Sequence, residues 1–229
     1  MNNNAQSPSR RRKKTAVLPL GSFEQHGPHL PLGTDIYIIE ALAGAIAADL
    51  GVFMLPVQPV STCYEHGGKN GSIHYSADIF YRFVVKIVES AYKNGFDNIA
   101  VLPGHGGIFV LGPAVDFMNV EHKGLKAVVI DPYDLGPVFL SKFGEGDLHA
   151  GDMETSLMLH LHPELVDTSK AADCVPDKPR EYLNYGSIFT MSPSGVWGRP
   201  TLASAEKGKA LFERAVESTV DKIISIFDL

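Results

Sequence analysis

The sequence predicts an α/β fold in which a mostly parallel sheet is covered by helices on both faces. Short apolar runs of strand length alternate along the chain with longer runs whose apolar residues recur at helical spacing. Strands separated by helices in this way pair in parallel, with helices on either side of the sheet. With 229 residues and 45% hydrophobic content, the chain is long enough to bury a full core, and we expect one domain.

Each element has its own signal. Strands are expected at 15–20, 52–57, 98–102 and 127–130, and helices at 36–49, 77–94, 108–120, 153–162 and 205–227. Gly51 and the Asn94-Gly95 pair stand where the first two helices should stop. Ser76 and Ser204 stand where the second and last helices need N-caps.

Residues 1–14 are predicted to form a disordered basic tail in front of a single domain at 15–229. The segment is polar and ends in Arg10–Lys14, a run that lacks apolar residues to bury. The whole chain has a net charge of −6 and a pI near 5.8, which argues against a basic nucleic-acid-binding surface. We therefore expect no nucleic-acid partner.

Membrane and secretory signals are not expected either. No apolar run approaches the roughly 18 residues that a membrane helix needs, and no apolar signal core follows the N-terminal charges. Two cysteines are too few for a disulfide framework, so the cytoplasm is the expected compartment.

The loop after the first strand carries the most informative chemistry. Glu24 and His26 are two residues apart, so on extended backbone their side chains point the same way. Asp35 follows a Gly/Pro-rich excursion that can fold back toward them, at the start of the next helix. Carboxylates with imidazole suit Zn²⁺, Mn²⁺ or Fe²⁺. The alternative is a polar loop whose histidines bond to the backbone.

A second candidate ligand follows the third strand. His105 lies in Gly104-His105-Gly106-Gly107, and the carboxyl ends of parallel strands share one edge of the sheet. His105 should therefore lie beside the first loop, unless it is an ordinary turn histidine.

The segment 149–156 adds a histidine and two carboxylates at the start of a helix. Glu154 near a helix N-terminus suits a metal ligand or a proton acceptor. His149 is a candidate for orienting a carbonyl group of a substrate or for donating a proton to it. For Asp152 we expect only a capping role. Tyr64 and His66 belong to the polar segment 64–68 after the second strand, which is placed to line the same pocket; the alternative is an ordinary loop. For Trp197, packing is the preferred role over a pocket wall.

Four motifs in this order resemble the creatininase family of metal-dependent amidohydrolases. They are the segment 21–35, Gly-His-Gly-Gly at 104–107, the segment 149–156 and the segment 195–208. The resemblance implies a three-layer α/β/α fold, a homo-oligomer (hexamers are common in the family) and a centre of two divalent metal ions. It implies that Asp35 bridges the metals, with Glu24 and His105 on one and His26 on the other.

Two departures limit the resemblance. Creatininase has a metal-binding glutamate two residues after the histidine that matches His105, and here that residue is Gly107. The second metal must then find another ligand or bind more weakly, and Glu154 and water are the candidates for that ligand. Creatininase also places two tryptophans around its substrate, where this chain has Tyr133 and Glu145. Candidate substrate contacts are Tyr64, His66, Gly106, Tyr133 and Trp197.

We therefore predict a metal-dependent amidohydrolase that cleaves a small-molecule amide, a non-peptide or cyclic C–N bond, without specificity for creatinine. A formylamino-pyrimidine nucleotide deformylase and a peptidase of the mycofactocin type, both branches of the same family, are alternatives. Phosphoester hydrolysis lacks a cluster of phosphate-binding cations near the motifs, where only Lys69 and Arg199 are near. A non-catalytic metal- or ligand-binding protein is the remaining alternative.

Overall fold

A parallel sheet of four strands forms the centre of the molecule. The computed structural model describes residues 12, 14–144 and 146–229. The strands are β1 (Thr15–Leu20), β2 (Phe53–Met54), β3 (Asn98–Pro103) and β4 (Lys126–Val129), and their order in the sheet is β2-β1-β3-β4. β1 pairs with β3 along its whole length, from Thr15 opposite Asn98 to Leu20 opposite Pro103. The carboxyl ends of the two central strands therefore lie side by side.

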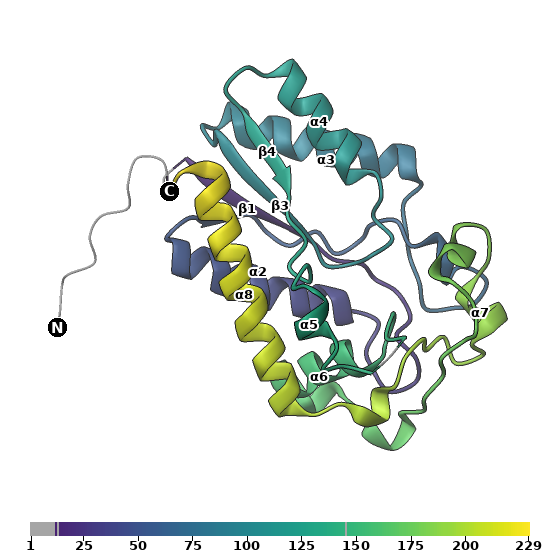
Figure 1. The fold of residues 1–229 in the computed structure, drawn as a ribbon. Helices are drawn as coiled ribbons and strands as arrows, with labels where there is room; N and C mark the ends of the chain where they lie inside the picture. The colour runs from purple at the N-terminus through teal and green to yellow at the C-terminus, as the bar shows by residue number, and fades with distance from the viewer. Residues whose placement is uncertain (1–11, 13, 145) are drawn as a thin grey trace.

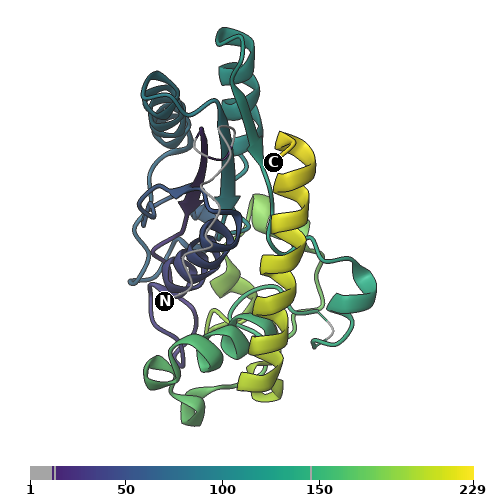
Figure 2. The ribbon, with the colours of Figure 1, turned by 90° about the vertical axis from the view of Figure 1, so that its left-hand side faces the viewer.

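Helices cover both faces of this sheet, as Figures 1 and 2 show. The longer helices are α2 (Thr34–Leu50), α3 (Ala77–Lys93), α4 (Leu111–Glu121), α6 (Asp152–Leu161) and α8 (Ala205–Phe227). Two short helices are α5 (Pro137–Leu140) and α7 (Ile188–Met191), and two short 3-10 helices near the site are η1 (Tyr64–His66) and η4 (Arg180–Asn184). The predicted α/β class and its three layers are confirmed.

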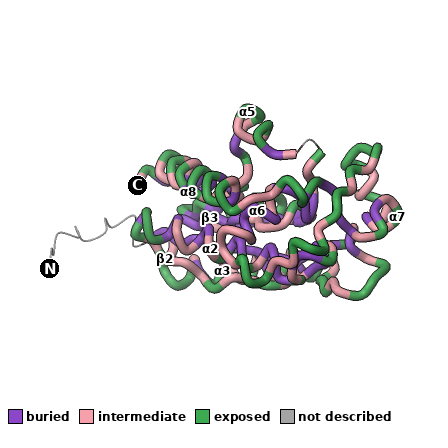
Figure 3. Tube along the Cα trace, turned by 90° about the horizontal axis from the view of Figure 1, so that it is seen from below, coloured by how far each residue is buried: buried purple, intermediate pink, exposed green. Residues whose placement is uncertain are grey.

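The alternation of side chains along the strands creates one core on each face. Leu18 and Val101 pack with α3 and α4, whereas Val17, Ala100 and Leu102 pack with α2, α6 and α8. Because both faces are apolar, the central strands are buried as far as Leu102 of β3, and Figure 3 shows buried backbone between the two helical layers.

Two expected boundaries were wrong for identifiable reasons. The second strand pairs only at Phe53 and Met54, because Pro56 has no N–H and interrupts the ladder, although Gln58 still bonds to β1. α4 begins at Leu111, because Ile108 packs into the core from the preceding loop. Its apolar character reflects burial and not helical periodicity.

The predicted helix ends are confirmed in three of four places. Gly51 adopts the left-handed conformation (φ 63°) that ends α2, Asn94 ends α3, and the Ser204 hydroxyl accepts from the Lys207 N–H to cap α8. Ser76 occupies the N-cap position of α3, but its hydroxyl bonds to the Asp78 carboxylate instead of the backbone.

The predicted disorder of residues 1–14 falls mostly outside the described residues. The two described members contact the domain, since Arg12 donates to the Leu50 carbonyl (3.0 Å) and Lys14 pairs with Asp97. Both cysteines are free thiols. Among the helices of the described chain, none has the length and apolar character needed to cross a bilayer.

Candidate metal centre

The candidate ligands come from loops at the carboxyl ends of the two central strands. β1 runs into the loop with Glu24 and His26, which turns at Gly27 (φ 67°) and returns to place Asp35 in the first turn of α2. The Gly104 N–H donates to the Leu20 carbonyl (2.7 Å), which fixes the end of β3, and so His105, beside this loop. The sheet edge thus brings the two motifs together.

Glu24, His26, Asp35 and His105 converge, as their positions at the sheet edge predict. His26 Nε2 lies 3.1 Å from Asp35 Oδ1, and His105 Nδ1 lies 3.1 Å from Glu24 Oε1 and 3.5 Å from Asp35 Oδ2. All four side chains are almost completely buried. The Asp35 carboxylate lies between the two histidines, with one oxygen toward each.

Two further side chains complete three-ligand groups around this core. His66 Nε2 is 3.1 Å from Glu24 Oε1, which forms a group with His105, and Glu154 Oε2 is 3.8 Å from His26 Nε2, which forms a group with Asp35. A third group contains Glu24, His26 and His149. The sequence suggested His66 only as a pocket residue. Nothing in its local motif distinguishes the two roles.

The donor set fits divalent cations. Glu24 Oε1, Asp35 Oδ2 and His105 Nε2 are buried without a hydrogen-bond partner among the described residues, although such atoms are normally satisfied. Imidazole with carboxylate is the donor chemistry of zinc and similar metals. A cation beside Glu24 and Asp35 would satisfy both carboxylate oxygens.

Without a metal, protons balance the buried carboxylates. Burial alone would lower the pKa of His26, but the adjacent Asp35 raises it to about 10. Burial likewise opposes protonation of His105, yet Glu24, Glu65 and Asp35 raise its pKa well above the usual value. Burial raises the pKa of Asp35. In the metal-free chain two imidazolium groups therefore occupy places that cations can take.

His149 is held neutral beside this centre. Burial, together with the charge on His26, lowers the pKa of His149 to about 3. Its Nε2 lies 2.7 Å from the Gln25 carbonyl, which can only accept, so Nε2 carries the proton. The unprotonated Nδ1 is 3.8 Å from Glu24 Oε1. In this state the imidazole can accept a proton at the centre but cannot donate one there.

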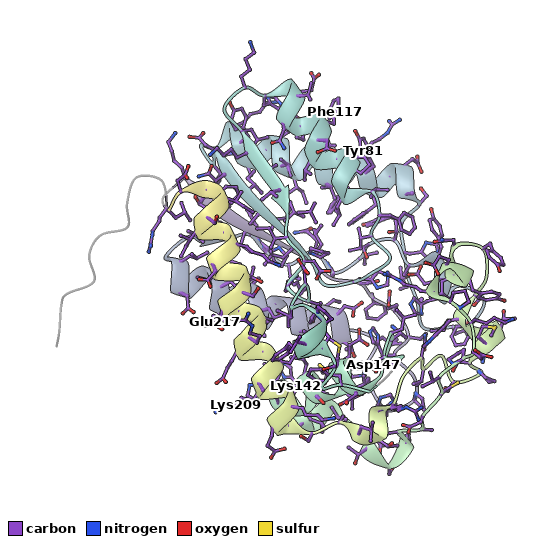
Figure 4. The ribbon with its side chains drawn as sticks, viewed as in Figure 1. Tyr81, Phe117, Lys142, Asp147, Lys209 and Glu217 are labelled. Atoms are coloured by element: carbon purple, nitrogen blue, oxygen red, sulfur yellow. The ribbon has the colours of Figure 1, made fainter. Side chains whose placement is uncertain are left out.

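Glu154 is positioned by the N-terminus of α6. Its Oε2 accepts a hydrogen bond from the Ala150 N–H (2.5 Å). The expected capping role of Asp152 is wrong, because Asp147 accepts from the N–H groups of Asp152 (2.7 Å) and Met153 (2.9 Å). Asp152 pairs instead with Lys207. The sequence could not identify Asp147, labelled in Figure 4, because it lies five residues before Asp152, the first residue of α6.

Two cavities of about 500 and 350 Å³ open beside the centre. His105, Gly106, Leu148, His149, Glu154 and Arg180 line both. Tyr64 and His66 line the larger cavity and Tyr133 the smaller one, at positions where the sequence suggested substrate contacts. Trp197 lines neither; it is 4% exposed and pairs with His149 through the backbone. Glu145 lies outside the described residues.

Glu65 fills the space beside Gly107. Its Oε1 lies 3.3 Å from His105 Nε2, and a Cβ atom on Gly107 would lie only 2.2 Å from that oxygen. Sequence reasoning did not select Glu65. The carboxylate thus comes from η1, on the far side of His105 from Glu24 and Asp35.

Comparisons with known proteins agree with this geometry. A model of the creatininase (creatinine amidohydrolase) family matches residues 2–223. A mycofactocin precursor peptide peptidase from Mycobacterium ulcerans is 33% identical over 220 residues, which cover 90% of this chain and 83% of the relative. A 3-dehydro-scyllo-inosose hydrolase from Thermotoga maritima is 29% identical, over 90% of this chain and 74% of that protein.

Solved structures show the same fold. A crystal structure of creatinine amidohydrolase superposes with a TM-score of 0.84 and 25% identity, covering 93% of this chain and 90% of that one. A zinc–zinc form of a creatininase mutant superposes with a TM-score of 0.83 and 26% identity, over 93% of this chain and 90% of that one. Fold and site together define a metal-dependent hydrolase of C–N bonds. The chain belongs to the creatininase family.

Metal loading should release protons at neutral pH. The pKa of His26 is about 10 and that of His105 is also raised, so both rings are protonated at pH 7 and must lose a proton to bind a cation. We expect release of about two protons per chain when both sites fill, and fewer protons as the pH rises through the raised pKa values of the two rings, about 10 for His26. Titration calorimetry with Zn²⁺ in buffers of different ionisation enthalpy measures this number. Proton-neutral loading at pH 7 would contradict it.

Exchanging the residues at positions 65 and 107 should test which position can supply the carboxylate beside His105 Nε2. A carboxylate that accepts the second N–H of a metal-bound histidine fixes its ring, and losing such a partner lowers metal affinity about 10- to 100-fold. We expect this loss for Glu65→Gln, measured by chelator competition, and partial recovery when Glu65→Gly is combined with Gly107→Glu. The single variant Gly107→Glu should fail to load, because Glu65 occupies its space. Unchanged affinity in Glu65→Gln would contradict this.

Proposed function

We propose that this chain hydrolyses an amide C–N bond at a centre of two divalent cations that share Asp35. The supporting observation is that Asp35 Oδ1 lies 3.1 Å from His26 while its Oδ2 lies 3.5 Å from His105. On this proposal, Glu24 and His105 hold one cation, with His66 beside them. His26 holds the other with Glu154, which takes the place of the ligand that is missing at Gly107.

The protein residues divide the remaining chemistry. Bound divalent cations supply an acidified water and a polarised carbonyl. His149 keeps Nδ1 free because its Nε2 donates to the Gln25 carbonyl, so Nδ1 would take a proton from the attacking water and pass it to the leaving nitrogen. Burial and the nearby Glu154 raise the pKa of Tyr133, so its hydroxyl stays protonated and can donate a hydrogen bond to the substrate. The other proton of His149 stays on Nε2, which donates its hydrogen bond to the Gln25 carbonyl throughout.

The substrate is larger than creatinine. The two cavities, about 500 and 350 Å³, meet at the centre, so an amide placed there can extend on both sides. A cyclic or formyl amide is the first candidate. A peptide bond is the second, favoured by 33% identity to a mycofactocin precursor peptide peptidase over 90% of this chain.

We further propose that the active form is a homo-oligomer in a reducing, cytoplasmic compartment. Support comes from large apolar side chains on the surface, among them Ile73 (61% exposed) and Val138 (85%), and from the two free thiols. Light scattering of the purified chain should give a mass that is a multiple of 24.8 kDa. A monomer would contradict the oligomer.

An activity screen with matched variants tests the reaction. Chain loaded with Zn²⁺, Mn²⁺ or Fe²⁺ should hydrolyse members of a panel of cyclic amides, formamides and short peptides, and a chelator should abolish turnover. His149→Ala should keep both metals but lose about two to four orders of magnitude in kcat. Asp35→Ala should lose metal and activity together, because both cations lose a shared ligand.

The variant Glu154→Gln distinguishes a metal-ligand role of Glu154 from a role in proton transfer. If Glu154 is a ligand, Glu154→Gln should lower the metal content toward one equivalent per chain, as measured by elemental analysis. Two equivalents with lost activity would assign Glu154 to proton transfer instead, and full activity would exclude both roles. A metal content of one equivalent or less in the wild-type chain would overturn the two-cation proposal itself.

A further inference from the structure

We propose that Arg180 binds an anionic group of the substrate, a carboxylate or a phosphate monoester, a short distance from the amide that is cleaved. The inference rests on the proposed amide hydrolysis and adds the substrate class to it. Among the described residues that line the two cavities, no other lysine or arginine is found. Arg180 lines both of them, so its charge acts on any ligand that enters either cavity.

The backbone fixes the guanidinium next to the metal centre. Arg180 is the first residue of η4, and its Nη2 donates to the Gly106 carbonyl at 3.0 Å, one residue beyond His105. A Cβ atom on Gly106 would lie 2.9 Å from that nitrogen. Glycine at 106 thus allows the guanidinium to come close to the loop, and a larger residue would push it away.

The guanidinium is not neutralised by a close carboxylate in the described part of the chain. Its charge contributes to lowering the pKa of Glu65 and acts on Asp131, but neither forms an ion pair with it. Glu65 Oε1 lies instead 3.3 Å from His105 Nε2, and Asp131 accepts the N–H of Tyr133 (2.8 Å). A guanidinium has five N–H donors, and the Gly106 carbonyl uses one of them. The others remain for a ligand.

The donor geometry selects the class of ligand. A planar guanidinium binds the two oxygens of a carboxylate or phosphate with parallel hydrogen bonds, which an ammonium group cannot do. The larger cavity also has an apolar side, where Phe109 (61% exposed), Leu183 and Ile188 lie. The substrate is therefore an amide with a nearby anionic group and an apolar part. A neutral cyclic amide such as creatinine has no group for Arg180.

The test compares charged and neutral probes of the same shape. N-formylglycine pairs with N-formylglycinamide for the carboxylate, and N-formyl-O-phosphoethanolamine with N-formylethanolamine for the phosphate. Binding to the Zn²⁺-loaded chain is measured by calorimetry or by competition, separately from turnover. We expect at least one charged probe to bind about 10- to 100-fold more tightly than its neutral partner, the usual value of a charge-assisted hydrogen-bonded pair. The pair with the larger ratio identifies the anion.

Variants separate Arg180 from the metals, which also attract anions. Arg180→Gln should reduce the charged-to-neutral ratio to below about 2-fold, and Arg180→Lys should keep an intermediate ratio because it retains the charge without the planar donors. Arg214→Gln removes the same charge from α8, where Arg214 pairs with Glu217 (labelled in Figure 4), and should leave the ratio unchanged. Metal content and melting temperature are checked for each variant.

The outcomes distinguish this inference from the proposed reaction. If the ratio is unchanged in Arg180→Gln, or near one in the wild type for both pairs, Arg180 is not an anion site. If the ratio depends on Arg180 but no amide is hydrolysed, the anion site stands and the proposed function falls. If amides are hydrolysed with a ratio that does not depend on Arg180, the reaction stands and this inference falls.

Discussion

The burial of two carboxylates at the end of a parallel sheet is the constraint on which the centre depends. Glu24 is fully buried and Asp35 is 2% exposed, and an unpaired charge in such a place is strongly destabilising. His26 and His105 balance them in the metal-free chain, and divalent cations can do so in their place. The same contacts that stabilise the metal-free fold therefore prearrange the candidate ligands.

Where creatininase has a glutamate, this chain has Gly107, and other loops supply carboxylates near that position. Glu65, from η1, fills the space that a side chain at 107 would need, and Glu154, from α6, lies within reach of His26. Negative charge around the centre is thus retained from other loops. Members of one fold family can keep a reaction class while their substrates differ, because the substrate contacts lie on these loops.

On the proposal above, the charge that matters for substrate choice is the guanidinium of Arg180. Metal ligands and proton carriers are shared by any amide reaction at this centre, so they say little about the rest of the substrate. Arg180, held on the Gly106 carbonyl, and the apolar residues of the larger cavity lie beyond the reacting atoms. Arg180 and Leu183 belong to η4, Ile188 begins α7 and Phe109 precedes α4, so all of them lie outside the four motifs that carry the family resemblance.

The sequence by itself predicted the fold class, most element boundaries and the convergence of four candidate ligands, because these depend on local signals and on position at the strand ends. The alternation of strand-length and helix-length apolar runs predicted the parallel sheet. Because the loops that follow β1 and β3 leave the same edge of the sheet, their candidate ligands were expected together: Glu24, His26, Asp35 and His105. Tertiary structure alone decided the roles of Glu65, Asp147 and Arg180. Their contacts depend on loops that are distant in sequence or on a turn before a helix, and such proximity leaves no periodic or motif signal in the chain.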